Sequence, residues 1–514
     1  MPLLNSFASW LMTKRMHQIE LFMKYPHEVQ NEWFRKLMDS AKDTEWGKKF
    51  SFRSIDTPER FANRVPLQDY ETMSPYIERI RRGEQNILWN TDIKWFAKSS
   101  GTTNDKSKFI PVSNESLEEC HFKGGKDMVA VYCNNYPETE IFTGKNLALG
   151  GSHNTDSFDN YESFHGDVSA IIMKHLPLWA EFLRSPELSI ALLSNFEEKL
   201  DKMASATMAE NVTSIAGVPS WMNVLLKRIL EISGKKNIKE VWPNLEVYFH
   251  GGVNFSPYKD NFKQMFGKGI VHYLEIYNAS EGFFGLQDQK KSSEMLLMLD
   301  YGIYYEFIPV NNGQDRKTIP LSEVKTGNNY AMVISTNGGL WRYQLGDTIR
   351  FTSTNPYRFR ITGRTKHFLN AFGEEVIIEN AEKALKIACE KSESIVKEYT
   401  VAPVFMNGLS ASSSGEISGA HEWLIEFEKN PDDLGYFTEV LDNALKSLNS
   451  DYEAKRFNNF VLRAPLIRQM REGTFYNWLK EKNKLGGQNK IPRLSNERKY
   501  VEEILQMTNC SNNE

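Results

Sequence analysis

Residues 270–282 read IVHYLEIYNASEG, an apolar run that ends in the polar residues of a turn. A second short apolar run covers residues 245–249, and helical periodicity marks residues 113–134, 176–209 and 220–232. Short apolar runs that alternate with helices are typical of buried strands in an α/β protein. We therefore predict the α/β fold class.

The residue patterns before and after this core predict different secondary structures. Residues 6–48 have helical periodicity, whereas the pattern from Met295 is rich in strands separated by Gly and Asn turns. Such a succession of strands predicts a strongly bent sheet or a small barrel. After Tyr357 strands and helices alternate again, so we predict a large domain over residues 1–363 and a small α+β domain over residues 364–514.

The small domain has its own pattern of elements. Apolar runs predict strands at residues 399–405, 421–428 and 458–466, and a helix is expected near residues 434–448. The chain shows neither an internal repeat nor a low-complexity segment.

Composition narrows the function classes. The 514 residues are 40% hydrophobic and 25% charged, which is the profile of a globular chain of two or more domains. The 62 basic and 66 acidic residues leave a net charge of −4. This balance gives no electrostatic basis for binding nucleic acid or an anionic membrane.

The cysteines and the N-terminus indicate a cytoplasmic protein. No two of the four cysteines have CxxC spacing, so we expect neither a disulfide framework nor a zinc site. The N-terminal sequence predicts an amphipathic helix and not a signal peptide, and a weak membrane-surface helix stays an alternative. No apolar run approaches the roughly 20 residues that span a bilayer.

The first polar motif is SSGTTNDKSK at residues 99–108, after a probable strand. Its hydroxyl groups, its backbone N–H groups and its lysines can surround phosphate oxygens. It lacks the glycine spacing of the GxxxxGK[ST] loop, and a solvated polar turn is an equally good interpretation of this motif alone.

The second motif is YNASEG at residues 277–282. Tyr277 can stack on a base, and the Glu281 carboxylate can bind Mg²⁺. Taken singly, the motif is better explained as a strand end with a buried tyrosine and a solvated glutamate.

The third motif is YQLGD at residues 343–347. The Asp347 carboxylate can accept hydrogen bonds from ribose hydroxyls. A Gly-Asp hairpin turn is the simpler interpretation of this motif alone.

The fourth motif is GGQNKIPR at residues 486–493. A lysine on a glycine-flanked loop can swing into a site and pair with phosphate. A flexible basic segment is the competing interpretation.

In their order along the chain, SSGTTNDKSK, HGGVNFSPY, YNASEG, YQLGD, GRTKHF and QNKIPR resemble the adenylate-forming superfamily of acyl- and aryl-acid ligases, to which firefly luciferase is related. The long helical N-terminus, YNASE, YQLGD and QNKIPR are similar to the auxin-responsive (GH-three type) acyl-acid amido synthetases. The resemblance covers essentially the whole chain. It implies a large N-terminal domain with mixed sheets and a β-barrel-like part, and a small mobile C-terminal domain.

The resemblance also implies how ATP is bound. The triphosphate would lie against Ser99, Ser100, Thr102, Thr103 and Lys108. The adenine would be bordered by Gly251, Gly252, Val253 and Tyr277.

The reacting groups follow from the same resemblance. Ser280 would face the α-phosphate, Glu281 would hold Mg²⁺, and Asp347 would bind the ribose with Arg364 at the hinge. Lys490 would reach the oxygens between the α-phosphate and the carboxylate, so Lys490 and Glu281 are the expected catalytic residues.

One residue departs from the pattern of many relatives, which have glycine where this loop has Asp105. A carboxylate near triphosphate is unfavourable unless it points away or meets Lys106 or Mg²⁺. Aspartate tolerates a left-handed backbone, so the expected loop shape is retained.

The implied reaction is activation of a small carboxylic acid as acyl-AMP and transfer of the acyl group to an amine, most readily that of an amino acid. Three alternatives stay open: a ligase that forms a thioester with coenzyme A, a nucleotide-binding protein without catalysis, and a structural protein in which the motifs are only turns. The acid, the acceptor and the oligomeric state are not readable from the sequence.

The acyl pocket has no motif. Trp221 and Met222, next to residues 218–220, can line a pocket but fit a helix core equally well, and Trp179 is similarly undecided. Among the ten histidines, His250 is the one expected near the site, because Gly251 follows it.

Overall fold

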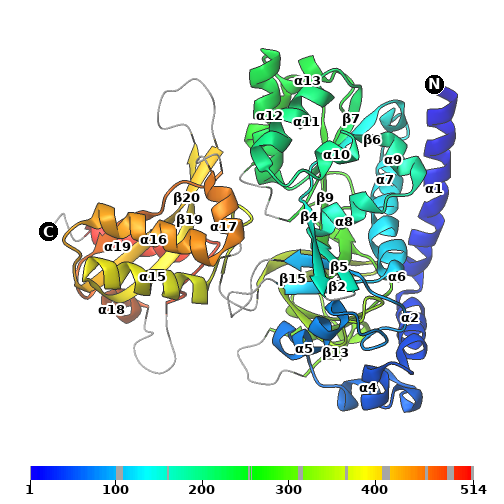
Figure 1. The fold of residues 1–514 in the computed structure, drawn as a ribbon, viewed down its shortest axis with the longest axis horizontal. Coiled ribbons are helices and arrows are strands. Elements are labelled where there is room, and N and C mark those ends of the chain that lie inside the picture. The colour runs from blue at the N-terminus through cyan, green and yellow to red at the C-terminus, as the bar shows by residue number, and fades with distance from the viewer. Residues whose placement is uncertain are drawn as a thin grey trace. The chain divides into compact units, whose positions relative to one another are not determined.

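The computed structural model forms two compact units, which are described one at a time (Figure 1). Unit 1 comprises Met1–Ser99, Lys108–Gly252 and Lys263–Thr365, and unit 2 comprises Ser100–Ser107, Val253–Phe262 and Lys366–Glu514. The structure describes residues 2–510 except residues 100–107, 159–160, 253–254, 256–257, 311–316, 365–367, 375, 408–416, 458–460 and 483–490.

The N-terminal part of unit 1 is helical, as the sequence predicts, and prolines begin several of its helices. Pro26 and Pro58 occupy the first turns of α2 and α4, where a missing N–H costs no hydrogen bond. An Asp69–Thr72 capping box begins α5. The elements are α1 (Pro2–Lys24), α2 (Pro26–Ala41), α3 (Glu45–Lys49), η1 (Phe52–Ser54), α4 (Pro58–Arg64) and α5 (Tyr70–Arg81).

A mixed sheet of twelve strands is the centre of unit 1. Its order is β13-β12-β14-β15-β16-β11-β10-β9-β8-β7-β3-β6, parallel from β9 to β6 and antiparallel elsewhere. The strands are β3 (Lys145–Ala148), β6 (Arg184–Ser185), β7 (Val212–Gly217), β8 (Val247–His250), β9 (His272–Ala279), β10 (Gly282–Leu286), β11 (Met295–Leu297), β12 (Ile303–Pro309), β13 (Ile319–Pro320), β14 (Asn329–Thr336), β15 (Tyr343–Thr354) and β16 (Tyr357–Arg364).

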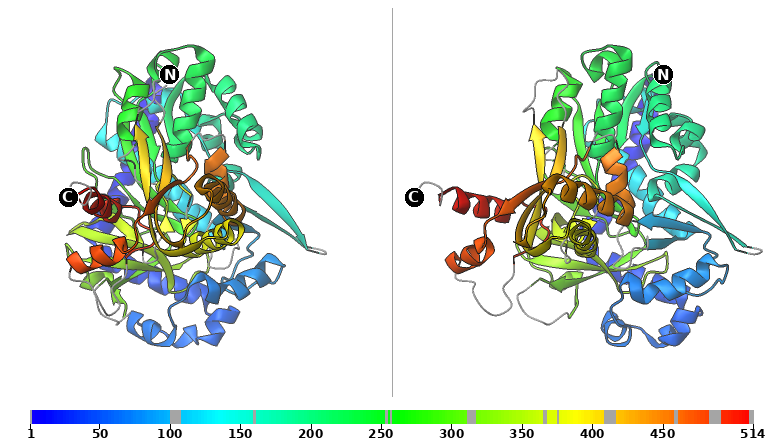
Figure 2. Two further views of the ribbon diagram at one scale, coloured as in Figure 1. Left: turned by 90° about the vertical axis from the view of Figure 1, so that its left-hand side faces the viewer. Right: turned by 60° about the vertical axis from the view of Figure 1, so that its left-hand side comes forward.

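A smaller sheet of order β2-β1-β5-β4 also belongs to unit 1. Its strands are β1 (Trp95–Ser99), β2 (Lys108–Val112), β4 (His153–Phe158) and β5 (Tyr161–Gly166). The β4–β5 ribbon projects from the rest of unit 1 (Figure 2).

Helices join these strands, and α7 runs beside α1 (Figure 1). The connecting elements are α6 (Asn114–Ser116), η2 (Leu117–Phe122), α7 (Lys123–Asn135), η3 (Ile141–Thr143), α8 (Val168–Lys174), α9 (Leu178–Leu183), α10 (Leu188–Ala191), α11 (Phe196–Thr207), α12 (Pro219–Ser233), α13 (Ile238–Val241), α14 (Lys259–Phe266) and η4 (Leu321–Glu323). The helical stretch predicted for residues 176–209 is wrong in one respect, because β6 interrupts it where Pro186 disfavours a helical residue before it.

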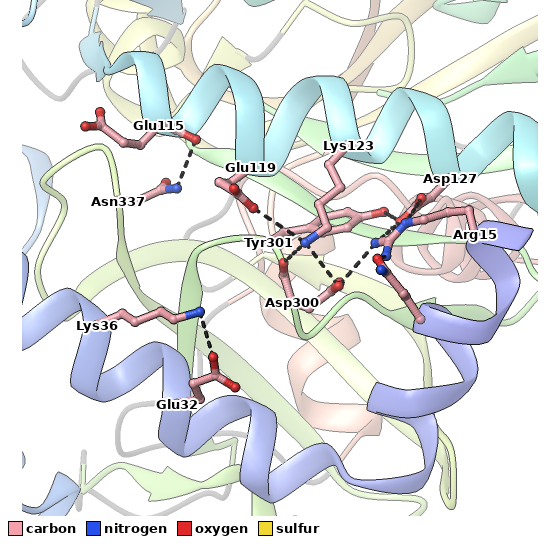
Figure 3. Close-up of polar contacts among 11 residues, drawn as sticks. Arg15, Glu32, Lys36, Glu115, Glu119, Lys123, Asp127, Asp300, Tyr301 and Asn337 are labelled. Carbon is pink, nitrogen blue, oxygen red and sulfur yellow. Dashed lines mark hydrogen bonds and ion pairs between the residues drawn. The ribbon is translucent and has the colours of Figure 1, made fainter. Parts of the chain in front are cut away.

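A buried ionic cluster fastens α1 to α7 and to the turn before β12 (Figure 3). Arg15 donates to Asp127 over 2.7 Å and to Asp300 over 3.1 Å, and Tyr301 donates to Asp127 over 2.8 Å. Lys123 completes the cluster through Asp300, 3.1 Å away. Burial lowers the pKa of Arg15, but the carboxylates outweigh burial and raise it above its ordinary value.

Unit 2 contains the three-stranded sheet β19-β20-β21, with α15 and α16 packed together. The strand predicted for residues 458–466 is displaced: residues 458–460 lie outside the described residues, Leu462 forms an isolated bridge with Gly419, and the third strand begins at Leu466, the last residue of the predicted range. Its elements are β17 (Phe368–Leu369), β18 (Val376–Ile377), α15 (Ile378–Ser392), β19 (Ile395–Asn407), β20 (Ile417–Lys429), α16 (Leu434–Leu448), α17 (Ser450–Arg456), β21 (Leu466–Met470), α18 (Thr474–Glu481) and α19 (Lys499–Cys510).

The predicted α/β fold class is therefore confirmed. In the part of the chain that the structure describes, every helix is too short or too polar to cross a membrane. The division into functional domains at residue 363 stays a prediction.

Candidate functional site

The parallel strands of unit 1 end at one edge of the large sheet, where α/β proteins bind ligands. Gly251 and Gly252 follow β8 at this edge. A side chain at Gly251 would lie 2.3 Å from the carbonyl oxygen of Ile276, so the backbone passes directly against β9. Gly252 has φ +83°, a left-handed conformation that favours glycine. Gly251 therefore lies against Ile276, the residue before Tyr277, and Gly252 faces Val218, which directly follows β7.

Tyr277 connects two of the predicted motifs. Its phenol donates a hydrogen bond to Oδ2 of Asp347, although β9 and β15 are not neighbours in the sheet. Its ring packs against Phe284, with centroids 5.0 Å apart, and against Phe359. Both Tyr277 and Asp347 are 7% exposed. The structure thus brings together residues that are 70 positions apart in the sequence.

Asp347 lies within a strand, which excludes the simpler hairpin-turn interpretation of YQLGD. Gly346 has φ +91°, and the pairing register of β14 with β15 shifts at this point. A glycine-centred irregularity of this kind bends a strand and re-aims the next side chain. The register partner of Asp347 on the neighbouring strand is Arg364, the last residue of β16.

Ser280 and Glu281 form the tight turn between β9 and β10, where Ala279 pairs with Gly282. Burial raises the pKa of Tyr343 well above its ordinary value, and the charge of Glu281 adds to this effect. The Glu281 carboxylate therefore lies within electrostatic reach of the phenol that begins YQLGD. The YNASEG and YQLGD motifs are therefore joined by the hydrogen bond from Tyr277 to Asp347, and the charge of Glu281 acts on Tyr343.

The base of the predicted phosphate loop lies near Tyr343, the first residue of YQLGD. Ser99 ends β1 and pairs with Lys108, which begins β2. The N–H group of Phe109 donates to the hydroxyl oxygen of Tyr70 over 2.9 Å, and Tyr70 also raises the pKa of Tyr343. Tyr70 thus links the loop base to the surroundings of Tyr343, on which the charge of Glu281 also acts.

Several predicted residues lie outside the described residues. These are Ser100, Thr102, Thr103, Asp105 and Lys106 of the phosphate loop, Val253, and Lys490.

The predicted surroundings of the site have mixed outcomes. His250 ends β8 at the expected edge, and burial lowers its pKa to about 3. Met222 is buried, and its methyl group packs against Gly217 at the end of β7. These contacts fit a helix core, and a role for Met222 or Trp221 in an acyl pocket stays a prediction, as does one for Trp179.

Sequence reasoning missed three groups beside the motifs. Glu275 lies on the same face of β9 as Tyr277, and burial raises its pKa to about 7. Cys120 and His121 contact the hairpin that carries Ser280 and Glu281. A glutamate within an apolar strand, in IVHYLEIY, is a signal that could have indicated the first of these.

No cluster of three or more metal-binding side chains occurs within the described ranges. A preformed cage of protein ligands is therefore absent from this part of the chain. Glu281 is a single carboxylate at a turn, which fits Mg²⁺ that arrives with ATP, since this ion commonly binds one or two carboxylates, phosphate oxygens and water.

Comparison with known proteins identifies relatives along nearly the whole chain. The GH3 family N-terminal, central and C-terminal domains match residues 15–270, 296–364 and 379–499. An indole-3-acetic acid-amido synthetase of Arabidopsis thaliana is 24% identical, over 90% of this chain and 88% of that protein. A jasmonoyl–L-amino acid synthetase of Nicotiana attenuata is also 24% identical, over 93% of each chain.

Solved structures share the fold. The GH3.15 acyl acid amido synthetase has a TM-score of 0.60 and 18% identity, covering 96% of this chain and 95% of that one. A 2-hydroxyisobutyryl-CoA ligase has a TM-score of 0.57 and 13% identity, covering 94% and 93%. The three consecutive family domains, together with the meeting of the YNASEG and YQLGD motifs, show that this chain belongs to the GH3 family.

Proposed function

We propose that this protein is an adenylate-forming ligase that activates a small carboxylic acid with ATP and joins it to an amine. The hydrogen bond from Tyr277 to Asp347 carries the proposal, because it unites the two nucleotide motifs at the ligand-binding edge of the sheet. Two relatives are named as an indole-3-acetic acid-amido synthetase and a jasmonoyl–L-amino acid synthetase. An amino acid is accordingly the preferred acceptor.

The reaction has two steps. A carboxylate oxygen of the acid attacks the α-phosphorus of ATP, the bond to the β-phosphate oxygen breaks, and pyrophosphate leaves. The amine nitrogen then attacks the acyl carbon, its proton passes to solvent or a base, and AMP leaves. Because the first attack joins two anions, catalysis depends mainly on positioning and charge neutralisation.

The residues near Tyr343 would bind the nucleotide. Ser99 and Lys108 would hold the triphosphate at the base of the loop, with Ser100, Thr102 and Thr103. Gly251, Gly252 and Val253 would border the adenine, as the family resemblance implies, with Tyr277 beside it. Asp347, held by Tyr277, would accept the ribose hydroxyls, and Arg364 would assist it.

The reacting phosphate would meet the Ser280–Glu281 turn and Lys490. Mg²⁺ bound with ATP supplies positive charge at the phosphates, and Glu281 is the residue that would hold it. Lys490 would neutralise the oxygens between the α-phosphate and the acid. These assignments fit a mechanism in which the protein orients the acid and shields the reactive acyl-AMP from water.

The decisive experiment measures acid-dependent ATP–pyrophosphate exchange over a panel of aryl, indolyl and short-chain acids. Exchange with at least one acid supports the proposal, and the product mass with amino acids or coenzyme A then separates an amide from a thioester. If ATP raises the melting temperature but no acid supports exchange, a nucleotide-binding protein without catalysis is the better description. No shift with any adenine nucleotide would favour a structural protein.

The role of Lys490 has its own test. Lys490→Ala should reduce exchange by about two to three orders of magnitude, because it removes a charge that acts mainly in the transition state. ATP binding, measured by calorimetry, should change less than about threefold, since substrate binding uses the other contacts. Unchanged exchange would remove Lys490 from the mechanism.

A further inference from the structure

A π-helical turn, η2 (Leu117–Phe122), interrupts the helix between α6 and α7. Turns of this kind are rare and occur frequently at functional sites, because the inserted residue changes the direction of the side chains around it. Cys120 and His121, two successive residues of this turn, are 2% and 4% exposed. Neither residue belongs to a nucleotide motif.

Both residues hold the hairpin that carries the Ser280–Glu281 turn. Nδ1 of His121 lies 3.2 Å from Oδ1 of Asn278 on β9. The backbone N–H of Phe283 on β10 donates to Sγ of Cys120 over 3.1 Å. Asn278 and Phe283 face each other across the hairpin, so η2 contacts both arms directly beside the turn.

The contact defines the chemical state of His121. Burial lowers the pKa of His121 to about 4, although the hydrogen bond with Asn278 acts in the opposite direction. The ring is therefore neutral near pH 7 and carries one proton. A hydrogen bond to an amide oxygen requires that proton on Nδ1, so the network assigns the Nδ1–H tautomer.

Close packing leaves the hairpin little freedom to move away from η2. A side chain at Gly124, in the first turn of α7, would lie 2.6 Å from the ring of Phe283. Lys123, next to it, is fastened to Asp300 (Figure 3). The hairpin is thus held against a helix that is itself fixed in unit 1.

We propose that His121 is a positioning residue, which acts through Asn278 to hold the Ser280–Glu281 turn in the geometry that adenylation requires. The proposal rests on the function proposed above. A turn fixed on both arms presents its side chains with little loss of conformational entropy when substrate binds. His121 itself need not touch the substrate.

The principal variant is His121→Leu, which removes the hydrogen-bond donor and replaces the ring by an apolar side chain that still fills the buried space. We expect acid-dependent exchange at saturating ATP to fall about tenfold, while the ATP dissociation constant changes less than about threefold. His121→Asn should restore most of the rate, because its amide nitrogen can occupy the place of Nδ1. A role in stability alone would lower the melting temperature without this pattern of loss and rescue.

The matched control is His272→Leu, because His272 lies on the same face of β9 as Asn278. His272 stacks on Tyr136, with centroids 3.8 Å apart, at the other end of the strand from the turn. This variant should keep exchange within about twofold of the wild-type rate.

Asn278→Ala tests the contact from the hairpin side, and serves if His121→Leu does not fold. It should reproduce the tenfold loss, and the double variant should be no worse than either single variant, since one interaction is lost in all three. Wild-type exchange in a folded His121→Leu or Asn278→Ala protein, or losses that multiply in the double variant, would overturn the proposal.

The tautomer provides a test that does not depend on activity. In protein labelled with ¹⁵N-histidine, the His121 signal should report the Nδ1–H form and should change in Asn278→Ala. An Nε2–H form in the wild-type protein would contradict the role of His121 as the donor in this contact. If none of the acids supports pyrophosphate exchange in the wild-type protein, the proposed function is contradicted. The His121 signal would still decide whether His121 donates to Asn278.

Discussion

Two carboxyl groups of unit 1, the buried Asp127 and the half-buried Glu275, have opposite surroundings. Asp127 on α7 accepts hydrogen bonds from Arg15 and Tyr301 and helps to hold α1 in place (Figure 3). Glu275 on β9 has no cation against it within the described ranges, and burial raises its pKa to about 7. Burial raises the pKa of Asp127 as well, but Arg15 and Tyr301 act in the opposite direction, whereas burial acts alone on Glu275. A carboxyl with a strongly shifted pKa is a common feature of functional sites. The contrast distinguishes a carboxylate that is held by ionic partners from one on which burial acts alone.

The largest expected change is in the free energy of unfolding when Asp127, the carboxylate paired with Arg15, is replaced. Asp127→Ala leaves the Arg15 guanidinium buried with half of its partners, so the free energy of unfolding should fall by about 3–5 kcal/mol. Denaturant unfolding measures this change. As a control, Lys36→Ala removes the exposed Glu32–Lys36 pair of α2 and should cost less than about 0.5 kcal/mol. Similar losses in both variants would contradict the distinction between buried and exposed pairs.

A smaller and pH-dependent effect is expected at Glu275. Its folded-state pKa of about 7 lies above the ordinary value of 4.5, so the folded protein binds the proton more tightly and stability falls as pH rises through this interval. Glu275→Gln removes that loss. Its advantage over the wild-type protein should grow by about 2 kcal/mol between pH 5 and pH 8. Urea midpoints at the two pH values test this, and a constant difference would show that Glu275 titrates normally.

The smallest expected effects concern two tyrosines, Tyr277 and Tyr301, each of which donates a hydrogen bond to a buried aspartate. Tyr277→Phe should weaken ATP binding about fivefold, which corresponds to loss of one hydrogen bond of about 1 kcal/mol. Tyr301→Phe, in the Arg15 cluster, should lower the free energy of unfolding by about 1 kcal/mol and leave ATP binding within about twofold. Calorimetry and denaturation distinguish the two, and equal effects on ATP binding would contradict a special role for Tyr277.

Much of the fold was accessible from local patterns. The apolar run in IVHYLEIY overlaps β9, and the run at residues 245–249 overlaps β8, whose residues are buried on both faces as a continuous apolar run predicts. The family resemblance drawn from the helical N-terminus, YNASE, YQLGD and QNKIPR is confirmed by three family domains. Strands β3, β4 and β5 were not predicted, since their sequences contain many polar residues and lack a periodic apolar signal.

In the candidate site, too, some features were predicted from the sequence and others were seen only in the structure. The sequence indicated Tyr277, Glu281 and Asp347 as separate signals, each with a plain structural explanation. It gave no sign that the Tyr277 phenol reaches Asp347, or that Gly346 lies at a strand irregularity instead of a hairpin turn. Roles for the phosphate-loop residues and for Lys490 stay predictions.

The sequence by itself determined the family, the α/β fold class and the residue types that suit a nucleotide, because these depend on local composition and on the order of motifs. Only the tertiary structure decided which residues meet: Tyr277 with Asp347, and His121 with Asn278, which are 157 positions apart. The physical reason is that a hydrogen bond between distant segments depends on strand order and side-chain direction, and neither quantity leaves a periodic trace in the chain.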